Sequence, residues 1–361
     1  MGRTRPRACL LIAVALAGCN AAWGLDETAL LNENPRTLRF DNSASGKDLV
    51  DVPVLVTLDA TRIRYEEVVD PATQLRFFDP ETSTDLAFEI ERWDPTGRSD
   101  VWVEVPQIDA RSTSDHILMF YGADAGGLER PAEVWSSSEF VFHGIPERLA
   151  SSVGDFAGTA VGVSRGDGII AGAPRMTSTG ESRVRFANSA TLLDGWDAFT
   201  LEVWIYADYT PTTLPAGAVS VLGNGRSVDA AYLERYAPSV RTQLELTFDL
   251  FFEASGTYPT SFLSFVPLQS WIYVAYTFDG RALWLYNNGA FADVSSSTMS
   301  TRLRTNASSN QLVLGATMDA FAGMIDEVRI SRSYRDVDWV NAQYLSMTGK
   351  LISFAAPGSG P

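Results

Sequence analysis

Hydrophobic and polar residues alternate with a period of two along most of the chain. Residues 101–105 read Val-Trp-Val-Glu-Val, and residues 244–250 read Leu-Glu-Leu-Thr-Phe-Asp-Leu. A strand with this pattern buries one face and exposes the other to water. Continuous apolar runs at 52–56 (Val-Pro-Val-Leu-Val) and 117–121 (Ile-Leu-Met-Phe-Tyr) predict more central strands.

Turn-forming sequences separate these strands at short intervals. They include Asp-Pro-Thr-Gly at 94–97, Gly-Asn-Gly at 223–225 and Asn-Asn-Gly at 287–289. Many short strands separated by such turns are typical of all-β sandwiches and barrels. The chain is therefore predicted to be all-β.

One segment has the period of a helix. Val337, Val340, Tyr344 and Met347 fall on one side of a stretch that begins near Tyr334, which predicts a short helix flanking the last strands. The polar break Ser-Ser-Ser at 136–138 is the expected boundary between two β-sandwich domains, and no internal repeat relates the halves. The chain of 361 residues is long enough for two such cores.

The first 19 residues have the layout of an export signal. Three arginines precede an apolar stretch at 8–17, which at ten residues is too short to span a bilayer, and Leu-Ala-Gly-Cys follows at 16–19. This segment resembles a bacterial lipoprotein signal, which implies cleavage after residue 18 and acylation of Cys19. The alternative is an ordinary secretory signal cut after Ala-Leu-Ala at 15–17. Cys9 is the chain's one other cysteine and lies within residues 1–18, so an internal disulfide is not expected after cleavage.

The net charge is −16, and without the three arginines of residues 1–18 the chain keeps 25 basic and 44 acidic residues. Such acidity argues against binding to nucleic acid or anionic lipid. A polar tether is expected at 19–35 and a flexible tail at 356–361.

The first half of the mature chain, residues 36–138, resembles the bacterial domain-of-unknown-function family 2341. The resemblance rests on Arg-Phe-Asp-Asn at 39–42, Leu-Arg-Phe-Phe-Asp at 75–79, Phe-Glu-Ile-Glu-Arg-Trp at 88–93 and Val-Trp-Val-Glu-Val-Pro at 101–106. The family usually has an acid before Leu-Arg-Phe, where this chain has Gln74, which weakens any proposal of a charged site there.

The second half, residues 140–355, resembles the laminin-G-like, concanavalin-A-like jelly rolls of bacterial surface proteins. The residues that carry this resemblance are Phe-Thr-Leu-Glu-Val-Trp-Ile at 199–205, Trp-Ile-Tyr-Val-Ala-Tyr at 271–276 and Phe-Ala-Gly-Met-Ile-Asp-Glu-Val-Arg-Ile at 321–330. The resemblance implies a jelly roll whose last strands precede the short helix.

No motif in the sequence predicts catalysis. The two histidines, His116 and His143, are expected to be structural or surface residues, and the sequence has neither a glycine-rich phosphate loop nor a Gly-x-Ser-x-Gly elbow. Concanavalin-A-like folds include glycosidases that use two acids, and such spacing occurs at Glu89 with Glu91 and, more loosely, in 245–249. Because apolar residues alternate with these acids, we expect them to lie on the solvated face of a half-buried strand. No catalytic residue is assigned.

A calcium site is a second hypothesis, because laminin-G-like domains often hold Ca²⁺ through Asp side chains and loop carbonyls. Asp326 lies at the family's Asp-Glu position, and Asp319 precedes it in a loop. The alternative is that Asp326 bonds backbone groups and fixes a strand crossing.

Ligand contacts are expected from aromatic side chains of the second domain. Tyr209, Tyr232 and Tyr236 lie within residues 208–241, a segment with Gly, Pro and Ser that is predicted to form variable rim loops. Trp284 alternates with leucines along a strand.

The leading functional interpretation is a non-enzymatic lipoprotein that binds glycan or protein ligands at the envelope, as in adhesion or recognition. One alternative is an accessory component of a proton-channel-linked biopolymer-transport complex, and another is a glycan-active enzyme. The Asn after Cys19, rather than Asp, favours the outer membrane by the rule of enteric bacteria. The sequence leaves the ligand, the exposed face of the membrane and the oligomeric state open.

Overall fold

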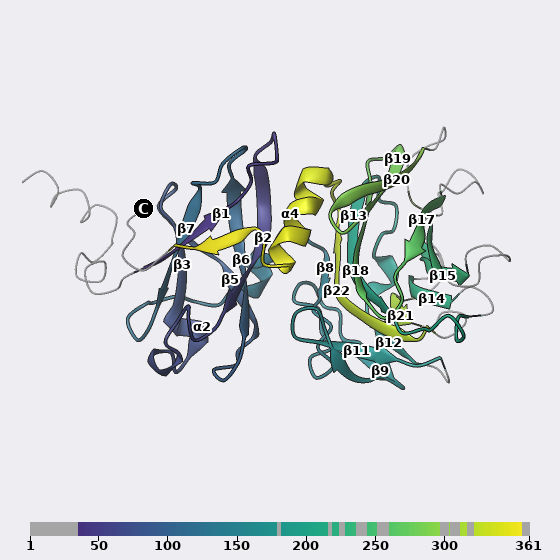
Figure 1. Cartoon of the computed structure of the whole chain (residues 1–361), viewed down its shortest axis with the longest axis horizontal. Helices are drawn as coiled ribbons and strands as arrows, with labels where there is room; N and C mark the ends of the chain where they lie inside the picture. The colour runs from purple at the N-terminus through teal and green to yellow at the C-terminus, as the bar shows by residue number, and fades with distance from the viewer. Residues whose placement is uncertain are drawn as a thin grey trace, which may run out of the picture.

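Most of the regular structure in the described part of the chain is β-strand, as the period of two predicts. The computed structural model describes residues 35–178, 182–215, 219–223, 228–235, 244–250, 260–296, 303, 311–315 and 321–355. The all-β fold with two sandwiches and one short C-terminal helix is confirmed (Figure 1). Among the described residues, no helix has both the length and the apolar character needed to cross a membrane.

The first domain packs a five-stranded sheet on a three-stranded sheet, in the orders β23-β1-β7-β3-β4 and β2-β6-β5. Short helical turns join some of these strands. The elements are β1 (Arg36–Phe40), β2 (Leu49–Leu58), η2 (Tyr65–Glu67), α2 (Pro71–Gln74), β3 (Leu75–Asp79), β4 (Thr84–Leu86), β5 (Phe88–Arg92), β6 (Ser99–Ile108), β7 (His116–Tyr121) and α3 (Pro131–Val134). The continuous apolar run at 52–56 lies in β2, as expected of a strand that is covered on both faces.

The second domain is a sandwich of an eight-stranded and a seven-stranded sheet. The first has the order β10-β11-β22-β13-β18-β19-β20, with β8 also pairing with β22, and the second has the order β17-β16-β15-β14-β21-β12-β9. The elements are β8 (Phe140–Phe142), β9 (Gly158–Val161), β10 (Ser164–Asp167), β11 (Gly172–Met176), β12 (Arg183–Phe186), η3 (Ser189–Thr191), β13 (Phe199–Ala207), β14 (Val219–Gly223), β15 (Val228–Arg235), β16 (Leu244–Leu250), β17 (Thr260–Val266), β18 (Trp271–Phe278), β19 (Ala282–Asn287), β20 (Ala290–Ser296), β21 (Val313–Gly315) and β22 (Gly323–Ser331).

The chain returns to the first domain after it has built the second. The last strand, β23 (Ile352–Phe354), pairs antiparallel with β1, so that Phe40 lies opposite Ile352. The range 140–355 expected for the second domain therefore ends with a strand that completes the first domain's sheet. Both ends of the described chain lie at the same end of the molecule, opposite the seven-stranded sheet (Figure 1).

Helix α4 (Val337–Met347) lies between the two sandwiches, where the sequence pattern predicted a short flanking helix (Figure 1). The Asp336 carboxylate caps it by accepting a hydrogen bond from the Trp339 amide at 3.2 Å. Since β2 is an edge strand, its outward backbone groups need partners. The Gln343 amide donates to the Pro53 carbonyl at 3.0 Å, and the Leu55 amide donates to the Ser346 hydroxyl at 2.7 Å. The helix thus closes the exposed edge of the three-stranded sheet.

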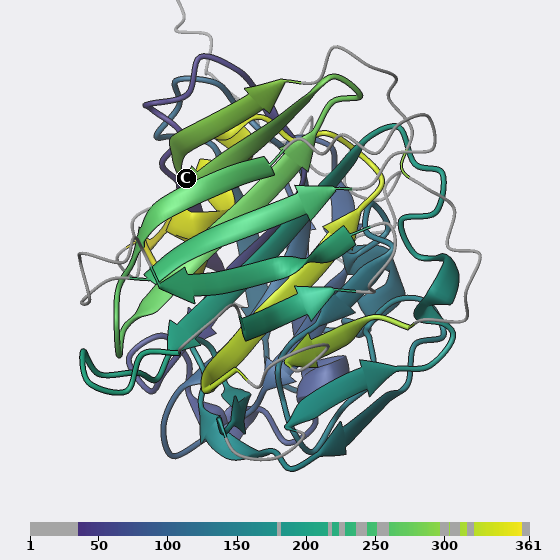
Figure 2. The same ribbon diagram turned by 90° about the vertical axis from the view of Figure 1, so that its right-hand side faces the viewer.

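The hydrophobic core does not stop at the domain boundary. One cluster of buried side chains lies between the two sheets of the second domain. The other contains Leu38 and Phe77 of the first domain, Val340 of α4, and Trp204 and Tyr273 on the outer face of the eight-stranded sheet. The two sandwiches and α4 therefore form successive layers with a shared core. Figure 2 shows the molecule from the end that carries the seven-stranded sheet.

Candidate functional site between the domains

Two glutamates of β5 point across the domain boundary. Glu89 and Glu91 were expected on a solvated face, and this expectation is wrong: their exposed fractions are 3% and 5%. The face of the three-stranded sheet that carries them is covered by the second domain, which a strand pattern read in isolation cannot reveal. Each carboxylate accepts a hydrogen bond from an indole N–H. Trp135 donates to Glu89 at 2.5 Å, and Trp102 donates to Glu91 at 2.8 Å.

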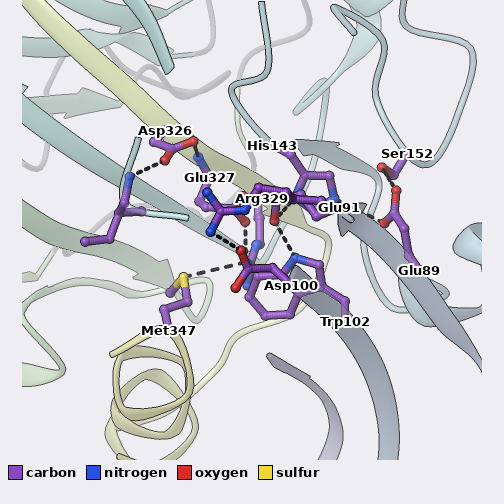
Figure 3. A network of polar contacts seen from close by, with 12 residues as sticks. Glu89, Glu91, Asp100, Trp102, His143, Ser152, Asp326, Glu327, Arg329 and Met347 are labelled. Carbon is purple, nitrogen blue, oxygen red and sulfur yellow. Dashed lines mark hydrogen bonds and ion pairs between the residues drawn. The ribbon is translucent and has the colours of Figure 1, made fainter. Parts of the chain in front are cut away.

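His143, which directly follows β8, lies among three carboxylates (Figure 3). Its Nε2 lies 3.1 Å from the Glu89 Oε2. Its Nδ1 lies 2.9 Å from the Glu327 Oε1 and 3.5 Å from the Glu91 Oε2. The Ser152 hydroxyl donates to the second oxygen of Glu89 at 2.6 Å. This buried histidine therefore joins β5 of the first domain to β22 of the second.

A bulge in β22 aims Glu327 at this cluster. Opposite β13, the register shifts between the pairs Trp204–Asp326 and Glu202–Arg329, so β22 holds one extra residue there. Glu327 has a φ of +50°, a conformation that costs a residue other than glycine about 1–2 kcal/mol. Because of the extra residue, Asp326 and Arg329, three positions apart, both lie opposite residues on the outer face of β13, and the side chain of Glu327 also reaches the cluster.

Arg329 lies across the other side of the cluster. Its guanidinium donates to the second oxygen of Glu327 and, at 2.8 Å, to the Gln343 side-chain oxygen on α4. It also stacks over two indoles, 4.2 Å from the ring centroid of Trp102 and 4.7 Å from that of Trp135. Because arginine keeps its charge when buried, it is a fixed cation at this boundary.

The electrostatics pair two cations with two anions. Burial opposes the charged form of Glu89, but the His143 charge and hydrogen bonds from His143, Ser152 and Trp135 lower the pKa of Glu89 to about 2. Burial also opposes ionisation of Glu327, yet His143 and Arg329 hold its pKa below the ordinary value. Burial disfavours protonated His143, whereas Glu327 and Glu89 raise its pKa well above the ordinary value. Burial and the nearby Glu327 charge raise the pKa of Glu91. The cluster thus balances Glu89 and Glu327 against His143 and Arg329.

Asp326 of β22 lies beside this cluster and is fully buried against the segment that leads to β11. Its Oδ2 accepts the Ile169 amide at 2.7 Å, and its Oδ1 accepts the Glu327 amide at 3.0 Å. Gly144 and Gly168 approach it so closely that an added Cβ would come within 2.2 Å and 2.5 Å of its oxygens. Asp326 therefore bonds backbone groups at a strand crossing, which was the alternative to a calcium ligand. Calcium binding stays a prediction, and Asp319 lies outside the described residues.

The aromatic residues predicted to contact a ligand lie in different surroundings. Tyr209 is only 3% exposed, its hydroxyl accepts the Ala322 amide at 2.8 Å, and a buried ring offers no face to a sugar. Tyr232 lies in β15 with its side chain outside the described part of the chain, and Tyr236 lies outside it altogether. Trp284 is half-buried on the outer face of β19.

Among the described residues, one group could hold a metal ion: Glu91, His143 and Glu327, whose ligand atoms all lie within 4.8 Å of one another. This group is not predicted from the sequence, because its members are far apart along the chain and belong to two domains. The apolar residues on both faces of β2 were the available signal that the first domain has a second buried face.

Comparison with known families supports the predicted order of the two domains. Residues 72–130 match the domain of unknown function 2341. Residues 178–341 match the laminin-G-type model of the concanavalin A-like lectin/glucanases superfamily. The two matches lie in the predicted order along the chain, and the second is to a concanavalin A-like domain. Comparison with curated proteins found no match.

Solved structures with related folds share little sequence with this chain. Domain 4 of AbnA, a GH43 extracellular arabinanase from Geobacillus stearothermophilus solved with arabinotriose, is 17% identical over 57% of this chain and 97% of that one, with a TM-score of 0.42. The botulinum neurotoxin serotype D ligand-binding domain, solved with N-acetylneuraminic acid, is 12% identical over 58% of this chain and 50% of its own, with a TM-score of 0.43. The binding domain of Paraclostridial Mosquitocidal Protein 1 is 15% identical over 58% of this chain and 52% of its own, with a TM-score of 0.45. These similarities concern the fold alone.

Proposed function

We propose that this protein is a non-enzymatic lipoprotein that binds glycans at the bacterial cell envelope through its concanavalin A-like domain. The observation that carries the proposal is the match of residues 178–341 to the lectin/glucanase superfamily. The described part of the chain begins and ends at the opposite end of the molecule from the seven-stranded sheet (Figure 1). An acyl group on Cys19 would tether the chain from the end that carries β1, which begins 17 residues later. The seven-stranded sheet would then lie at the end of the described molecule farthest from the attachment of the tether.

The shared core favours rigid presentation of that sheet. Two domains joined by a linker move independently unless the interface between them is large and apolar. Here α4 bonds β2, β23 pairs with β1, and one buried cluster extends across the boundary. The first domain would therefore act as a fixed spacer.

Burial of the alternate acids in β5 argues against glycoside hydrolysis at that position. Glu89 and Glu91 are 3% and 5% exposed, and both accept indole hydrogen bonds. A glycosidase needs its two carboxyl groups on either side of a scissile bond in an open cleft. Glu89 and Glu91 are therefore not proposed as a catalytic pair, and the function that we propose for the concanavalin A-like domain is binding.

A glycan array probed with the purified full-length protein tests the binding function. We expect selective binding that is about 2- to 10-fold weaker in Tyr232→Ala and in Tyr236→Ala, since stacking on one aromatic ring contributes about 0.5–1.5 kcal/mol. Tyr121→Ala, in the first domain, is the matched control and should bind normally. Absence of glycan binding, with co-purification of inner-membrane channel proteins, would favour the transport-complex alternative. Binding to a protein instead would refute the glycan assignment.

Metabolic labelling with an acyl-chain probe tests the anchor separately. We expect label in the wild type and in Cys9→Ser, since Cys9 lies within the segment that cleavage would remove, and no label in Cys19→Ser. Label retained in Cys19→Ser would exclude Cys19 as the acylated residue.

A further inference from the structure

The Nδ1 atom of His143 faces more acceptors than one proton can serve. Glu327 Oε1 lies at 2.9 Å, within hydrogen-bond distance, but Glu91 Oε2 lies at 3.5 Å. The other oxygen of Glu91, Oε1, is buried and has no hydrogen-bond partner. A buried polar atom without a partner costs about 1–3 kcal/mol and calls for an explanation.

We propose that Glu91, His143 and Glu327 bind one divalent transition-metal ion that links the two domains. The first domain would supply the Glu91 carboxylate, and the second would supply the His143 Nδ1 and the Glu327 carboxylate. The ligand atoms lie 2.9 Å and 3.5 Å apart along the two edges that meet at Nδ1. The third edge, between the Glu91 and Glu327 carboxylates, is no longer than 4.8 Å. Ligands held at about 2.0–2.2 Å from one ion are separated by roughly 3.0–3.5 Å, so two of the three edges already have about the required length, and rotation of the Glu91 carboxylate would adjust the third.

The surroundings of each ligand match those of a metal site. A histidine that binds a metal through one nitrogen usually donates its other N–H to a carboxylate. His143 Nε2 does so to Glu89, which Trp135 and Ser152 hold in place. The proposed ligand carboxylates are fixed in the same way, because Trp102 donates to Glu91 and Arg329 donates to Glu327.

Charge and ligand chemistry narrow the choice of ion. The cluster contains three glutamates and one arginine, so a neutral imidazole and an ion of charge +2 give an overall charge of zero. Loading the ion displaces the proton that Nδ1 shares with Glu327 and any proton on Glu91, because ligands bind in their deprotonated forms. A ligand set of one nitrogen and two carboxylates suits Zn²⁺ or Mn²⁺, whereas Ca²⁺ takes oxygen ligands.

Zinc analysis of the full-length protein tests this proposal. Because the ligands are buried, the protein is unfolded with chelator and refolded at pH 8 with or without Zn²⁺, and bound zinc is then counted by plasma mass spectrometry. We expect about one ion per chain, and a melting temperature higher by roughly 5 °C or more in the zinc-loaded protein. Less than a tenth of an ion per chain, with the same melting temperature after refolding with Zn²⁺ or Mn²⁺, would overturn the proposal.

Matched variants locate the ion. Glu91→Gln preserves the size of the side chain and an oxygen for the Trp102 indole, so the variant should fold but lose the ion. Glu89→Gln, next to the site, should weaken binding by about 10–100-fold. Glu104→Gln, on β6, should bind the ion normally.

If the Glu91 variant fails to fold, X-ray absorption spectroscopy of the zinc-loaded wild type identifies the ligands. Nitrogen and oxygen ligands at about 2.0–2.2 Å with imidazole scattering support the proposed site, whereas a shell of water oxygens refutes it. An ion retained in Glu91→Gln would place it elsewhere.

Discussion

Leu38 of β1 lies directly opposite Phe354 of β23, so the first and last strands of the described chain are neighbours in one sheet. The concanavalin A-like domain is therefore an insertion between strands of the first domain. The first domain cannot complete its five-stranded sheet until β23, Ile352–Phe354, has been synthesised.

This pairing predicts that a short C-terminal truncation destabilises the first domain. A stop after Gly349 removes β23 and Leu351, which is 1% exposed in the core. We expect a loss of at least about 3 kcal/mol in the free energy of unfolding, by analogy with large-to-small core substitutions. Urea denaturation followed by Trp fluorescence measures it. A stop after Ala355, which keeps β23, should have no effect; equal losses in both truncations would rule out the strand pairing as the cause.

The edge of β2 leads to a second prediction. Ser346→Ala leaves the Leu55 amide without its acceptor in a buried position, so the folded state should lose about 1–3 kcal/mol. Ser353→Ala, at an exposed position of β23, is the control and should change stability by less than about 0.5 kcal/mol. Chemical denaturation of both variants compares them. If Ser346→Ala leaves the free energy of unfolding unchanged, water replaces the hydroxyl at this edge.

Stability should also depend on pH through Glu104. Burial, and then the charge of Asp51, raise the pKa of Glu104 to about 7. Since this folded-state pKa lies above the ordinary value of 4.5, the folded state binds the proton more tightly. Its contribution to stability is therefore full below pH 4.5, falls as the pH rises to about 7, and then stays constant.

Glu104→Gln removes this dependence. We expect the variant to gain about 1 kcal/mol over the wild type at pH 8, a figure discounted because the side chain is only half-buried, and to gain nothing at pH 4. Melting curves at the two pH values provide the measurement. Glu81→Gln, at an exposed position, is the control. The same gain at both pH values would show that Glu104 acts through packing rather than through its proton.

The sequence pattern was sufficient for the elements but not for the contacts between domains. Period-two alternation, the apolar run in β2 and the spacing of Val337, Val340 and Met347 all predict elements that the structure contains. The same reasoning put Glu89 on a solvated face, because alternation shows that a strand has two faces but not what covers the second. His143 and Glu327 are separated by most of the second domain's sequence, so only the folded topology brings them together.

Two glycines with similar backbone angles give the sharpest test of how tightly Asp326 is enclosed. Gly144 has a φ of +73° and Gly349 a φ of +68°, so alanine carries a similar conformational cost of about 1–2 kcal/mol at each. The two positions differ in the room available for a side chain. An added Cβ at Gly349 meets nothing within 4 Å, whereas at Gly144 it lies 2.2 Å from the Asp326 Oδ1. Gly144→Ala must therefore also displace a buried carboxylate that holds the amides of Ile169 and Glu327.

We expect Gly349→Ala to lower the free energy of unfolding by about 1–2 kcal/mol, and Gly144→Ala to lower it by at least about 2 kcal/mol more. Denaturant titration of the two variants gives the difference. In an Asp326→Ala background the clash at position 144 is absent, so the two glycine substitutions should then cost nearly the same. If Gly144→Ala keeps its larger cost in that background, contact with Asp326 is not its source. The remaining explanation is the second contact of the added Cβ, 3.1 Å from the Gly172 carbonyl oxygen.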